Sequence, residues 1–412
     1  MADVIVLGAG MVGVATALQL QKRGLSVALV DRTAPGRETS YGNAGIIQSE
    51  AVEPYALPRN LATLLAIALG RSNDVNYHWS ALPSFAGPLL RYWWHSAPAR
   101  HARVSKTYAE LIAIAIAEHA PFIDEAGAGD LIAKKGFRQL YRSQQAFDED
   151  VADARRIHER HGVPLAILDP DEMRAAEPAL KTGGVGAIHW TGTWTASDPG
   201  GLVEAYADLF ARSGGTLATG DATTLAERSG GGWRVATDDG PLEAERVVVA
   251  LGPWSPQLLE RFGYNIPMVR KRGYHRHYRQ LAPVDAPFID MEWGYVVAPM
   301  RAGLRITTGA EIAAQDAPQT PVQLARCEKA LGELIDLGAP VENRPWMGAR
   351  PCMPDMLPVV GEAPRHKGLW MHFGHGHQGF TLGPATGRML AELMTGETPF
   401  EDATLLSAAR FG

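Results

Sequence analysis

The chain has 412 residues, of which 46% are hydrophobic and 20% are charged, and its formal net charge at pH 7 is −6. These values are typical of a globular protein with one large α/β unit or two closely joined domains, and they exclude a mainly disordered or membrane-embedded chain. The acidic balance also argues against a nucleic-acid partner, because such proteins carry a basic domain or stripe. We therefore expect small-molecule ligands.

Cys327 and Cys352 are the only cysteines in the sequence. They exclude a disulfide framework and a four-thiolate zinc site within one chain, and they favour the cytoplasm. The N-terminal stretch MADVIVLGAG has no basic region and no cleavage motif, so it predicts a strand rather than a signal peptide. We expect a cytoplasmic protein.

Residues 3–31 predict a strand, a glycine turn, a helix and a second strand, which together make a βαβ unit. Gly8, Gly10 and Gly13 of the turn GAGMVG have the spacing of a dinucleotide-binding fingerprint. The first glycine permits the tight turn, the second lets the backbone approach a diphosphate, and the third lets the helix pack closely. Asp31 ends the second strand, where its carboxylate can accept hydrogen bonds from a ribose. The pattern favours NAD or FAD over NADP.

The middle of the chain is less regular and contains two apolar stretches. LATLLAIALG (61–70) is too short to span a bilayer, which needs about 20 apolar residues. This stretch and PLLRYWWHSAP (88–98) could touch a membrane or a quinone as interfacial segments, although packing in the core explains both equally well. The sequence thus leaves open a peripheral contact with the inner face of the cell membrane.

The second half of the chain predicts a mixed arrangement of strands and helices. A βα stretch ends in the apolar strand RVVVALG, and residues 264–312 then predict a mainly antiparallel sheet. The last part returns to strand, glycine loop and helix. The expected fold class is α/β, with a Rossmann-like FAD-binding domain assembled from separate segments and an α+β substrate-binding domain. The expected boundaries are 1–55, 196–262 and 346–412 for the first domain, and 56–195 and 263–345 for the second.

Four further stretches carry a resemblance to a known family. They are TSYGNAGII (39–47), VVVALGPWS (247–255), WMGARPCMPDMLPVVG (346–361) and HFGHGHQGFTLGPATG (372–387). Together with the N-terminal fingerprint, they resemble the FAD-dependent D-amino-acid oxidase superfamily, which includes glycine oxidase, sarcosine oxidase and the bacterial D-amino-acid dehydrogenases. The dehydrogenase branch is the most similar. The resemblance covers nearly the whole chain and is loose over about residues 55–195.

The resemblance implies that the cofactor is FAD and identifies the residues that would bind it. The fingerprint would hold the ADP half, residues 40–46 would pass the diphosphate and the flavin, residues 250–254 would form a second ADP-side motif, and residues 374–381 would face the flavin ring. The implied cofactor-binding residues are Gly8, Gly10, Met11, Val12, Gly13, Asp31, Arg32, Ser40, Asn43, Ala44, Gly45, Ile46, Ala222, Ala250, Gly252, Trp254, Gly374, Gly376, Gln378, Gly379, Phe380 and Thr381.

The resemblance also implies the residues that handle the substrate. Arg350 falls on the arginine that binds the substrate carboxylate in this family, and a bidentate guanidinium would orient the α C–H toward flavin N5. Tyr274 could donate a hydrogen bond to that carboxylate, and His275 could accept one from the amine. An exposed basic strand is an equally good interpretation of this stretch. His375 is expected to contact the flavin ring or the substrate.

The implied reaction is oxidation of a D-amino acid. The α hydrogen passes as hydride to flavin N5, and the imino acid hydrolyses to a 2-oxo acid. The electrons would go to a quinone or another carrier, as in the dehydrogenase branch, or to oxygen, as in the oxidases. Three alternatives remain open: a secondary amino acid, such as D-hydroxyproline or sarcosine, or glycine as substrate; a non-catalytic FAD-bearing subunit of a complex; and an NAD-dependent dehydrogenase.

The histidine-rich loop near the C-terminus invites a metal-site interpretation. His372, His375 and His377 have no carboxylate or thiolate nearby in the sequence, so no metal is expected. The glycines between them would let the backbone run against the flavin, and the next helix would direct its N-terminus at the N1–C2=O edge. The spacing of Cys352 from Pro354 and Asp355 is too short for the covalent flavin link of sarcosine oxidases, so we expect dissociable FAD.

Overall fold

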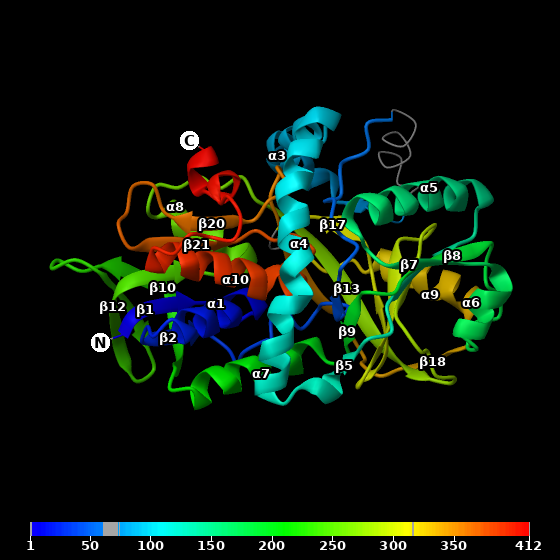
Figure 1. Ribbon diagram of the computed structural model, residues 1–412. Helices are drawn as coiled ribbons and strands as arrows, with labels where there is room; N and C mark the ends of the chain where they lie inside the picture. The colour runs from blue at the N-terminus through cyan, green and yellow to red at the C-terminus, as the bar shows by residue number, and fades with distance from the viewer. Residues whose placement is uncertain (1, 61–72, 74, 315–316, 412) are drawn as a thin grey trace.

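The computed structural model describes residues 2–60, 73, 75–314 and 317–411. The apolar stretch 61–70, for which the sequence suggested an interfacial role, lies outside the described residues. Figure 1 shows a parallel sheet with its helices on the left and a mainly antiparallel sheet on the right. The long helix α4 (Pro98–Ala126) crosses the front of the molecule in this view, over the boundary of the two sheets.

The first sheet has the order β10-β2-β1-β12-β21-β20, parallel except for the edge strand β20. Strand β11 pairs antiparallel with the second half of β10 and the first half of β12. The bounds are β1 (Ala2–Leu7), β2 (Val27–Asp31), β10 (Thr216–Glu227), β11 (Trp233–Thr237), β12 (Gly240–Val249), β20 (Val359–Glu362) and β21 (Leu369–Phe373). Strands from both ends of the chain therefore meet in one sheet.

Strand β1 is buried on both faces, as its continuous apolar run predicts. Val4 and Val6 pack in a cluster with the helices, whereas Ile5 and Leu7 pack with Trp233 and its neighbours on the opposite face. On the helical face, α1 packs against α7 and α10, and α4 packs against α7 and α10. The bounds are α1 (Met11–Lys22), α7 (Pro199–Arg212) and α10 (Gly379–Thr395).

Small residues bring α1 and α10 close together. A Cβ at Gly383 would lie 2.8 Å from Met11 Cγ, and one at Gly387 would lie 3.1 Å from the Thr16 nitrogen. Protein interiors are close-packed, so any side chain at these positions would force the helices apart. This contact joins the first helix of the chain to its last long helix.

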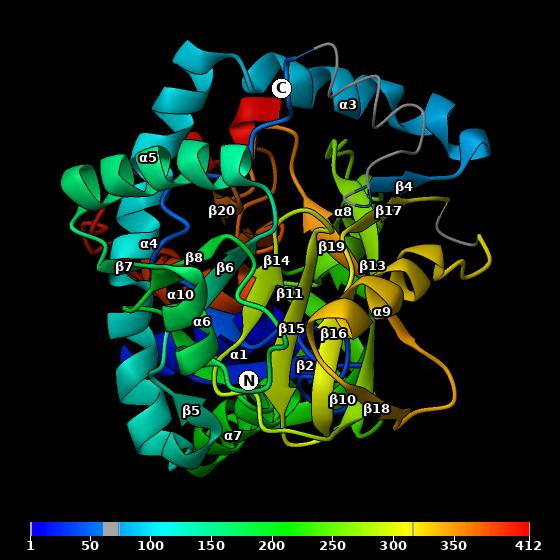
Figure 2. The same ribbon diagram turned by 90° about the vertical axis from the view of Figure 1, so that its right-hand side faces the viewer.

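The second sheet has the order β4-β17-β13-β16-β15-β14-β6-β8-β7, and β18 and β19 also pair with β13. Figure 2 views this sheet from its own side of the molecule. Its strands are β4 (Val75–Tyr77), β6 (Phe137–Tyr141), β7 (Leu165–Leu168), β8 (Gly186–Trp190), β13 (Val269–Gln280), β14 (Phe288–Asp290), β15 (Tyr295–Met300), β16 (Gly303–Thr307), β17 (Ala310–Ile312), β18 (Leu337–Pro340) and β19 (Trp346–Cys352). The antiparallel pairings predicted for residues 264–312 are confirmed.

The remaining elements surround these sheets. Strand β9 pairs with β3 on one side and β5 on the other, and α6 begins with a capping box in which Asp169 and Glu172 bond each other's backbone. The bounds are β3 (Ile46–Ile47), β5 (Ile132–Ala133), β9 (Trp194–Ala196), α3 (Leu82–His95), α5 (Gln144–His161), α6 (Pro170–Ala176), α8 (Ser255–Glu260) and α9 (Val322–Leu334).

The predicted fold class is confirmed, since a Rossmann-like parallel sheet built from separate segments lies beside a mainly antiparallel sheet. The division into domains at residues 55, 195, 262 and 345 stays a proposal. In this division α4 belongs to the second domain but packs on helices of the first sheet. Strand β19 belongs to the first domain but pairs with β13 of the second sheet. The segments 98–126 and 346–352 thus connect the two parts.

Candidate functional site

A cavity of about 1110 Å³ extends from the carboxyl ends of the parallel strands to the second sheet. This is above the range of about 300–1,000 Å³ that is usual for drug-sized ligands, and carboxyl strand ends are where open α/β sheets bind them. Most of the predicted site residues line it: Gly8, Gly10, Met11, Val12, Asp31, Arg32, Ser40, Asn43, Ala44, Ile46, Ala222, Ala250, Gly252, Trp254, Tyr274, Arg350, Gly374, His375, Gly376, Gly379 and Phe380. Gly13, Gly45, His275, Gln378 and Thr381 lie behind this wall.

The fingerprint glycines occupy three different environments. Gly8 has φ +107°, and a Cβ on it would lie 2.5 Å from the Ala250 carbonyl oxygen. A Cβ on Gly13 would lie 1.8 Å from the Gly8 carbonyl oxygen, so the helix can approach the turn only without a side chain there. A Cβ on Gly10 would meet nothing nearer than the Ser40 hydroxyl at 3.3 Å. Gly10 therefore leaves free space toward the cavity, as a diphosphate requires.

The N-terminus of α1 adds donors to this part of the cavity. Gly10 is its N-cap and has no side chain to bond the first amides, while the Met11 amide donates to Ser40 Oγ at 3.0 Å. The first amides of a helix have no intrahelical acceptor and carry partial positive charge, which suits an anion such as a phosphate.

One end of the cavity is shaped for a nucleoside. Asp31 Oδ2 accepts from the Ala9 amide at 2.6 Å, which fixes the carboxylate at the end of β2. The Arg32 guanidinium lies 4.6 Å above the ring of Trp254 and pairs with Glu38 at 2.6 Å. Ala222 lines the same cavity from β10. The residues predicted for the ADP half thus come together from three separate segments.

Arg305 holds the segment that follows the fingerprint. Its guanidinium donates to the Tyr41 carbonyl at 2.9 Å and to the Asn43 carbonyl, and its Nε donates to His277 at 2.9 Å. Burial lowers the pKa of Arg305 to about 10, which still leaves it charged at neutral pH. This role of Arg305 could not be predicted from the sequence, because the contact joins β16 to a loop more than 250 positions away in the chain.

The predicted flavin-facing loop has the backbone that its glycines suggested. Gly374 and Gly376 have φ values of +86° and +59°, in the left-handed region that favours glycine. The Gly376 amide donates to the Pro351 carbonyl at 2.9 Å, and α10 begins at Gly379 without a side-chain cap on its first amides. Because Gly379 and Phe380 line the cavity, the positive end of α10 faces it.

Gln378 and Thr381 support the site from behind. The side-chain amide of Gln378 donates from Nε2 to Gln48 Oε1. Thr381 Oγ1 donates to the Ile46 carbonyl at 3.3 Å. Gln48 in turn lines the cavity. These contacts connect the N-terminus of α10 to the segment after Gly45. Gly45 itself has no room for a side chain, since a Cβ on it would lie 2.1 Å from the Ala196 carbonyl oxygen.

Two histidines of the loop, His372 and His375, each contact a threonine. Thr16 Oγ1 donates to the Val12 carbonyl, so it accepts from Nδ1–H of His372 at 2.7 Å. Nε2 of His375 lies 2.9 Å from Thr386 Oγ1, and burial lowers the pKa of this imidazole to about 3. Burial also lowers the pKa of His372, so both rings are neutral at physiological pH. Among the described residues, no group of three His, Cys, Asp or Glu side chains is arranged to hold a metal.

Arg350 lies in the cavity wall on β19, which pairs with β13 of the second sheet. Its two terminal nitrogens donate to the carbonyls of Gly309 and Thr308, each at 3.0 Å. A Cβ on Gly273 of the neighbouring strand would lie 2.6 Å from Nη1, so only glycine leaves room for this guanidinium. Burial lowers the pKa of Arg350, but a guanidinium remains charged in proteins. Gly273 is thus a site residue that the sequence interpretation did not single out.

The predicted roles of Tyr274 and His275 need correction. The Tyr274 hydroxyl donates to Glu311 Oε2 at 2.7 Å and accepts from Arg272 at 3.0 Å and from the Thr320 amide at 2.9 Å, so it has no proton left for a substrate. His275 is 2% exposed and lies outside the cavity wall, with its ring stacked on Trp346 at 4.8 Å between centroids. Nor is this strand an exposed basic one, since most of its residues are buried.

The cavity fits the cofactor that the resemblance implies. The free space at Gly10, the fixed carboxylate of Asp31 and the helix N-termini of α1 and α10 suit a nucleoside, a diphosphate and a second ring system in that order. His372 Nε2 is also a buried polar atom with no protein partner among the described residues, beside this wall. The residues that would hold FAD are therefore present at matching positions.

We predict that FAD dissociates from this protein. Cys352 lines a smaller neighbouring cavity rather than the main one, and burial raises the pKa of its thiol, so little reactive thiolate is present. Acid precipitation of the purified yellow protein should leave all flavin absorbance in the supernatant. Colour that stays with the pellet would instead indicate a covalent link.

Comparison with known proteins agrees with this arrangement. Residues 3–393 match the family model described as FAD dependent oxidoreductase. The chain is 31% identical to a D-amino-acid oxidase of Bradyrhizobium diazoefficiens, covering 99% of this chain and 98% of the relative, and 30% identical to a D-amino acid dehydrogenase of Rhizobium rhizogenes, covering 99% and 100%. Glycine oxidase from Geobacillus kaustophilus has the same fold, with a TM-score of 0.76 at 22% identity over 99% of this chain and 98% of that one.

Proposed function

Because the chain belongs to the family of FAD-dependent oxidoreductases that includes D-amino-acid oxidases and dehydrogenases, we propose that it oxidises a D-amino acid to an imino acid. The observation that carries this proposal is Arg350. It is a fixed guanidinium in the cavity wall, with two carbonyl partners and further N–H groups that face no carboxylate among the described residues. A substrate carboxylate is the natural partner for such a fork.

Arg350 orients the substrate in this mechanism. Two parallel N–H···O bonds fix the plane of the carboxylate, and this plane sets the direction of the α C–H bond. FAD, when bound, supplies the acceptor for the hydride that leaves the α carbon. The N-terminus of α10 stabilises negative charge at the adjacent part of the cavity. Hydrolysis of the imino acid to a 2-oxo acid completes the reaction.

The histidines of the wall are weak bases near neutral pH, because burial lowers their pKa values. Burial lowers the pKa of His375 to about 3, and burial together with the charges of Arg350 and Lys271 lowers the pKa of His377. Both imidazoles are therefore neutral over the working range. The substrate amine must itself be neutral, so that its lone pair drives loss of the hydride.

We expect kcat/KM to rise with pH to a plateau, with a single ascending limb between pH 6 and 10. The limb reports deprotonation of the substrate ammonium, because His375, with its pKa of about 3, has already lost its proton at pH 6. Initial rates over this range at saturating acceptor measure the profile. A flat profile, or an added limb near pH 6.5, would contradict this assignment.

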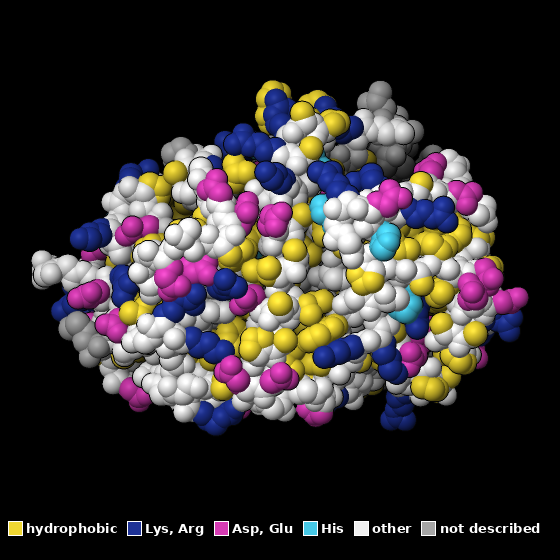
Figure 3. Space-filling view, in the orientation of Figure 1, with side chains coloured by type: hydrophobic (Ala, Val, Ile, Leu, Met, Phe, Trp, Pro, Cys, Tyr) yellow, Lys and Arg dark blue, Asp and Glu magenta, His cyan; other side chains and the backbone are white. Residues whose placement is uncertain are grey.

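The electron acceptor is proposed to be a quinone or another carrier, with oxygen as the alternative. Among the described residues, no helix has the length and hydropathy to cross a bilayer. Leu90 and Trp94 of α3 are 66% and 53% exposed, and Figure 3 shows apolar and basic side chains together at this end of the molecule. This surface supports a peripheral contact of a cytoplasmic protein with the inner face of the membrane.

Anaerobic bleaching of the flavin with a panel of amino acids tests the proposed function. D-amino acids should bleach it, and their L enantiomers should not. Bleaching by sarcosine, D-hydroxyproline or glycine alone would favour the secondary-amine or glycine alternative, and no bleaching would favour a non-catalytic subunit. Reoxidation in air, compared with reoxidation by a soluble quinone, then decides the acceptor.

A further inference from the structure

Lys271 lies next to Arg350 in the wall of the cavity. The two residues are direct partners in the antiparallel pairing of β13 with β19, so their side chains leave the sheet on the same face. Opposite residues in such a pair have Cβ atoms about 4.5–5.5 Å apart. Both residues line the main cavity. Two cationic side chains therefore share one region of the wall.

Among the residues that the structure describes, this region holds no compensating carboxylate. The acidic residues in the described wall are Asp31, Glu38 and Asp221, which belong to its nucleoside end. In the part of the chain that the structure describes, neither Lys271 nor Arg350 forms an ion pair with an acid. The Lys271 ammonium lies over the ring of Tyr92, 4.8 Å from its centroid.

Two neighbouring cations without acids are costly to keep in a partly buried site, because they lose water and repel each other. Their fields also reach the same groups: both charges act on His377 and on Cys352. A ligand with one carboxylate would neutralise only one of them. A ligand with two carboxylates would pair both, and each bond would be charge-assisted.

We propose that the preferred substrate carries a second carboxylate, which binds Lys271 while Arg350 holds the α-carboxylate. The inference rests on the proposed function for the role of Arg350. Lys271 also lines the smaller cavity beside the main one, together with Tyr55, Tyr92 and His377. This position places the second carboxylate at the boundary of the two cavities. D-aspartate and D-glutamate have this chemistry on the side chain, and iminodiacetate has it on the amine.

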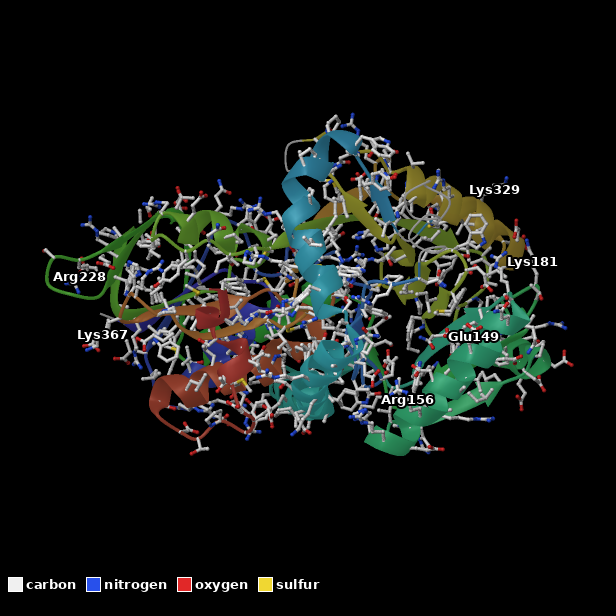
Figure 4. All side chains as sticks on the ribbon, turned by 90° about the horizontal axis from the view of Figure 1, so that it is seen from above. Glu149, Arg156, Lys181, Arg228, Lys329 and Lys367 are labelled. Atoms are coloured by element: carbon white, nitrogen blue, oxygen red, sulfur yellow. The ribbon has the colours of Figure 1, made fainter. Side chains whose placement is uncertain are left out.

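The kinetic test compares D-glutamate with D-glutamine, which has the same size and no side-chain charge. The wild-type ratio of their kcat/KM values should exceed about ten, since a hydrogen bond to a charged group contributes about tenfold or more. The Lys271→Met variant should lower this ratio at least tenfold, and Lys271→Arg should retain most of it. Lys329→Met, on the outer face of α9 (Figure 4), is the matched control and should leave the ratio unchanged.

Iminodiacetate, tested beside D-glutamate, decides where the second carboxylate is attached. Flavin content and the melting temperature of each variant show whether it folds, and Lys271→Gln replaces the methionine variant if that one does not. A wild-type preference for D-glutamine, or an unchanged ratio in a folded Lys271 variant, would overturn the inference.

A binding measurement separates this inference from the proposed function. Glutarate and valerate have the same chain length and cannot be oxidised at an α-amine, and either can be titrated against the flavin spectrum of the oxidised holoenzyme. We expect the Kd of glutarate to be at least about tenfold lower than that of valerate, and Lys271→Met to remove this difference. If amino acids bleach the flavin but glutarate binds no better, the inference fails and the function stands. If glutarate binds better but no amino acid bleaches the flavin, the function fails instead.

Discussion

Replacing Arg350 with methionine should lower kcat/KM for the best D-amino acid by roughly a thousandfold. Each charge-assisted hydrogen bond contributes about 1.5–3 kcal/mol, and loss of two bonds removes about 3–6 kcal/mol, where 1.4 kcal/mol is a factor of ten. The loss of orientation adds to this effect, because the α C–H is no longer directed at the acceptor. Stopped-flow bleaching under anaerobic conditions measures the reductive step directly.

The structure offers controls that separate binding of substrate from folding. Arg350 contacts the carbonyls of Thr308 and Gly309, so its removal could also loosen this loop. Arg350→Lys keeps a cation but loses the fork, and it should recover part of the activity. Arg228→Met, in the hairpin between β10 and β11 at the far edge of Figure 4, should not change the kinetics. Wild-type kinetics in a flavin-loaded Arg350→Met protein would refute the proposed role.

Alanine at Gly13 should destabilise the apoprotein, whereas alanine at Gly10 should leave its stability unchanged. At Gly13 the new Cβ would lie 1.8 Å from the Gly8 carbonyl oxygen, a backbone atom that cannot move without disturbing the turn. We expect a loss of at least about 3 kcal/mol in the free energy of unfolding, the upper end for overpacking. At Gly10 the nearest atom is a hydroxyl at 3.3 Å, so the apoprotein should keep its stability.

For FAD binding, in contrast to stability, the alanine at Gly10 should be harmful. Its Cβ would enter the space left for the diphosphate, and we expect the Kd for FAD to rise by about tenfold or more. Urea unfolding of the two apoproteins and FAD titration of the folded one measure both effects. Equal stability of the Gly13→Ala and Gly10→Ala apoproteins would show that the helix can shift to accept the side chain.

The fingerprint could be interpreted from the sequence because the interactions that determine its structure join residues close together in the chain. Gly8, Gly13 and Asp31 lie within one βαβ unit, and the turn, the helix packing and the carboxylate position follow from residues close in the chain. The glycine loop was equally accessible, since Gly374 and Gly376 need backbone conformations that few other residues adopt. Arg350 was identified by resemblance, and the structure adds the carbonyls that hold it.

The residues around Arg350 could not be predicted in the same way. The sequence RKRGYHRHY shows that the strand has two faces, but not which face meets the cavity. That choice depends on the pairing with β19, whose residues follow some 70 positions later. Trp346 covers His275, and Glu311 accepts the hydrogen bond that the Tyr274 hydroxyl donates. These contacts come from distant segments, and they assign the hydroxyl and the imidazole to the interior rather than to the substrate.

The alternation along β13 also has a consequence for how this enzyme can diverge. Lys271, Gly273 and Tyr274 line the cavity, while the Arg272 guanidinium and the Tyr274 hydroxyl belong to the buried network of Glu311. With the proposed role of Lys271, substrate specificity would depend on one set of alternate positions of this strand, and its stability on the other set. Position 271 can be substituted, in evolution or by design, while the ion pair between Arg272 and Glu311 stays intact. The same strand can therefore acquire new substrates without first losing its fold.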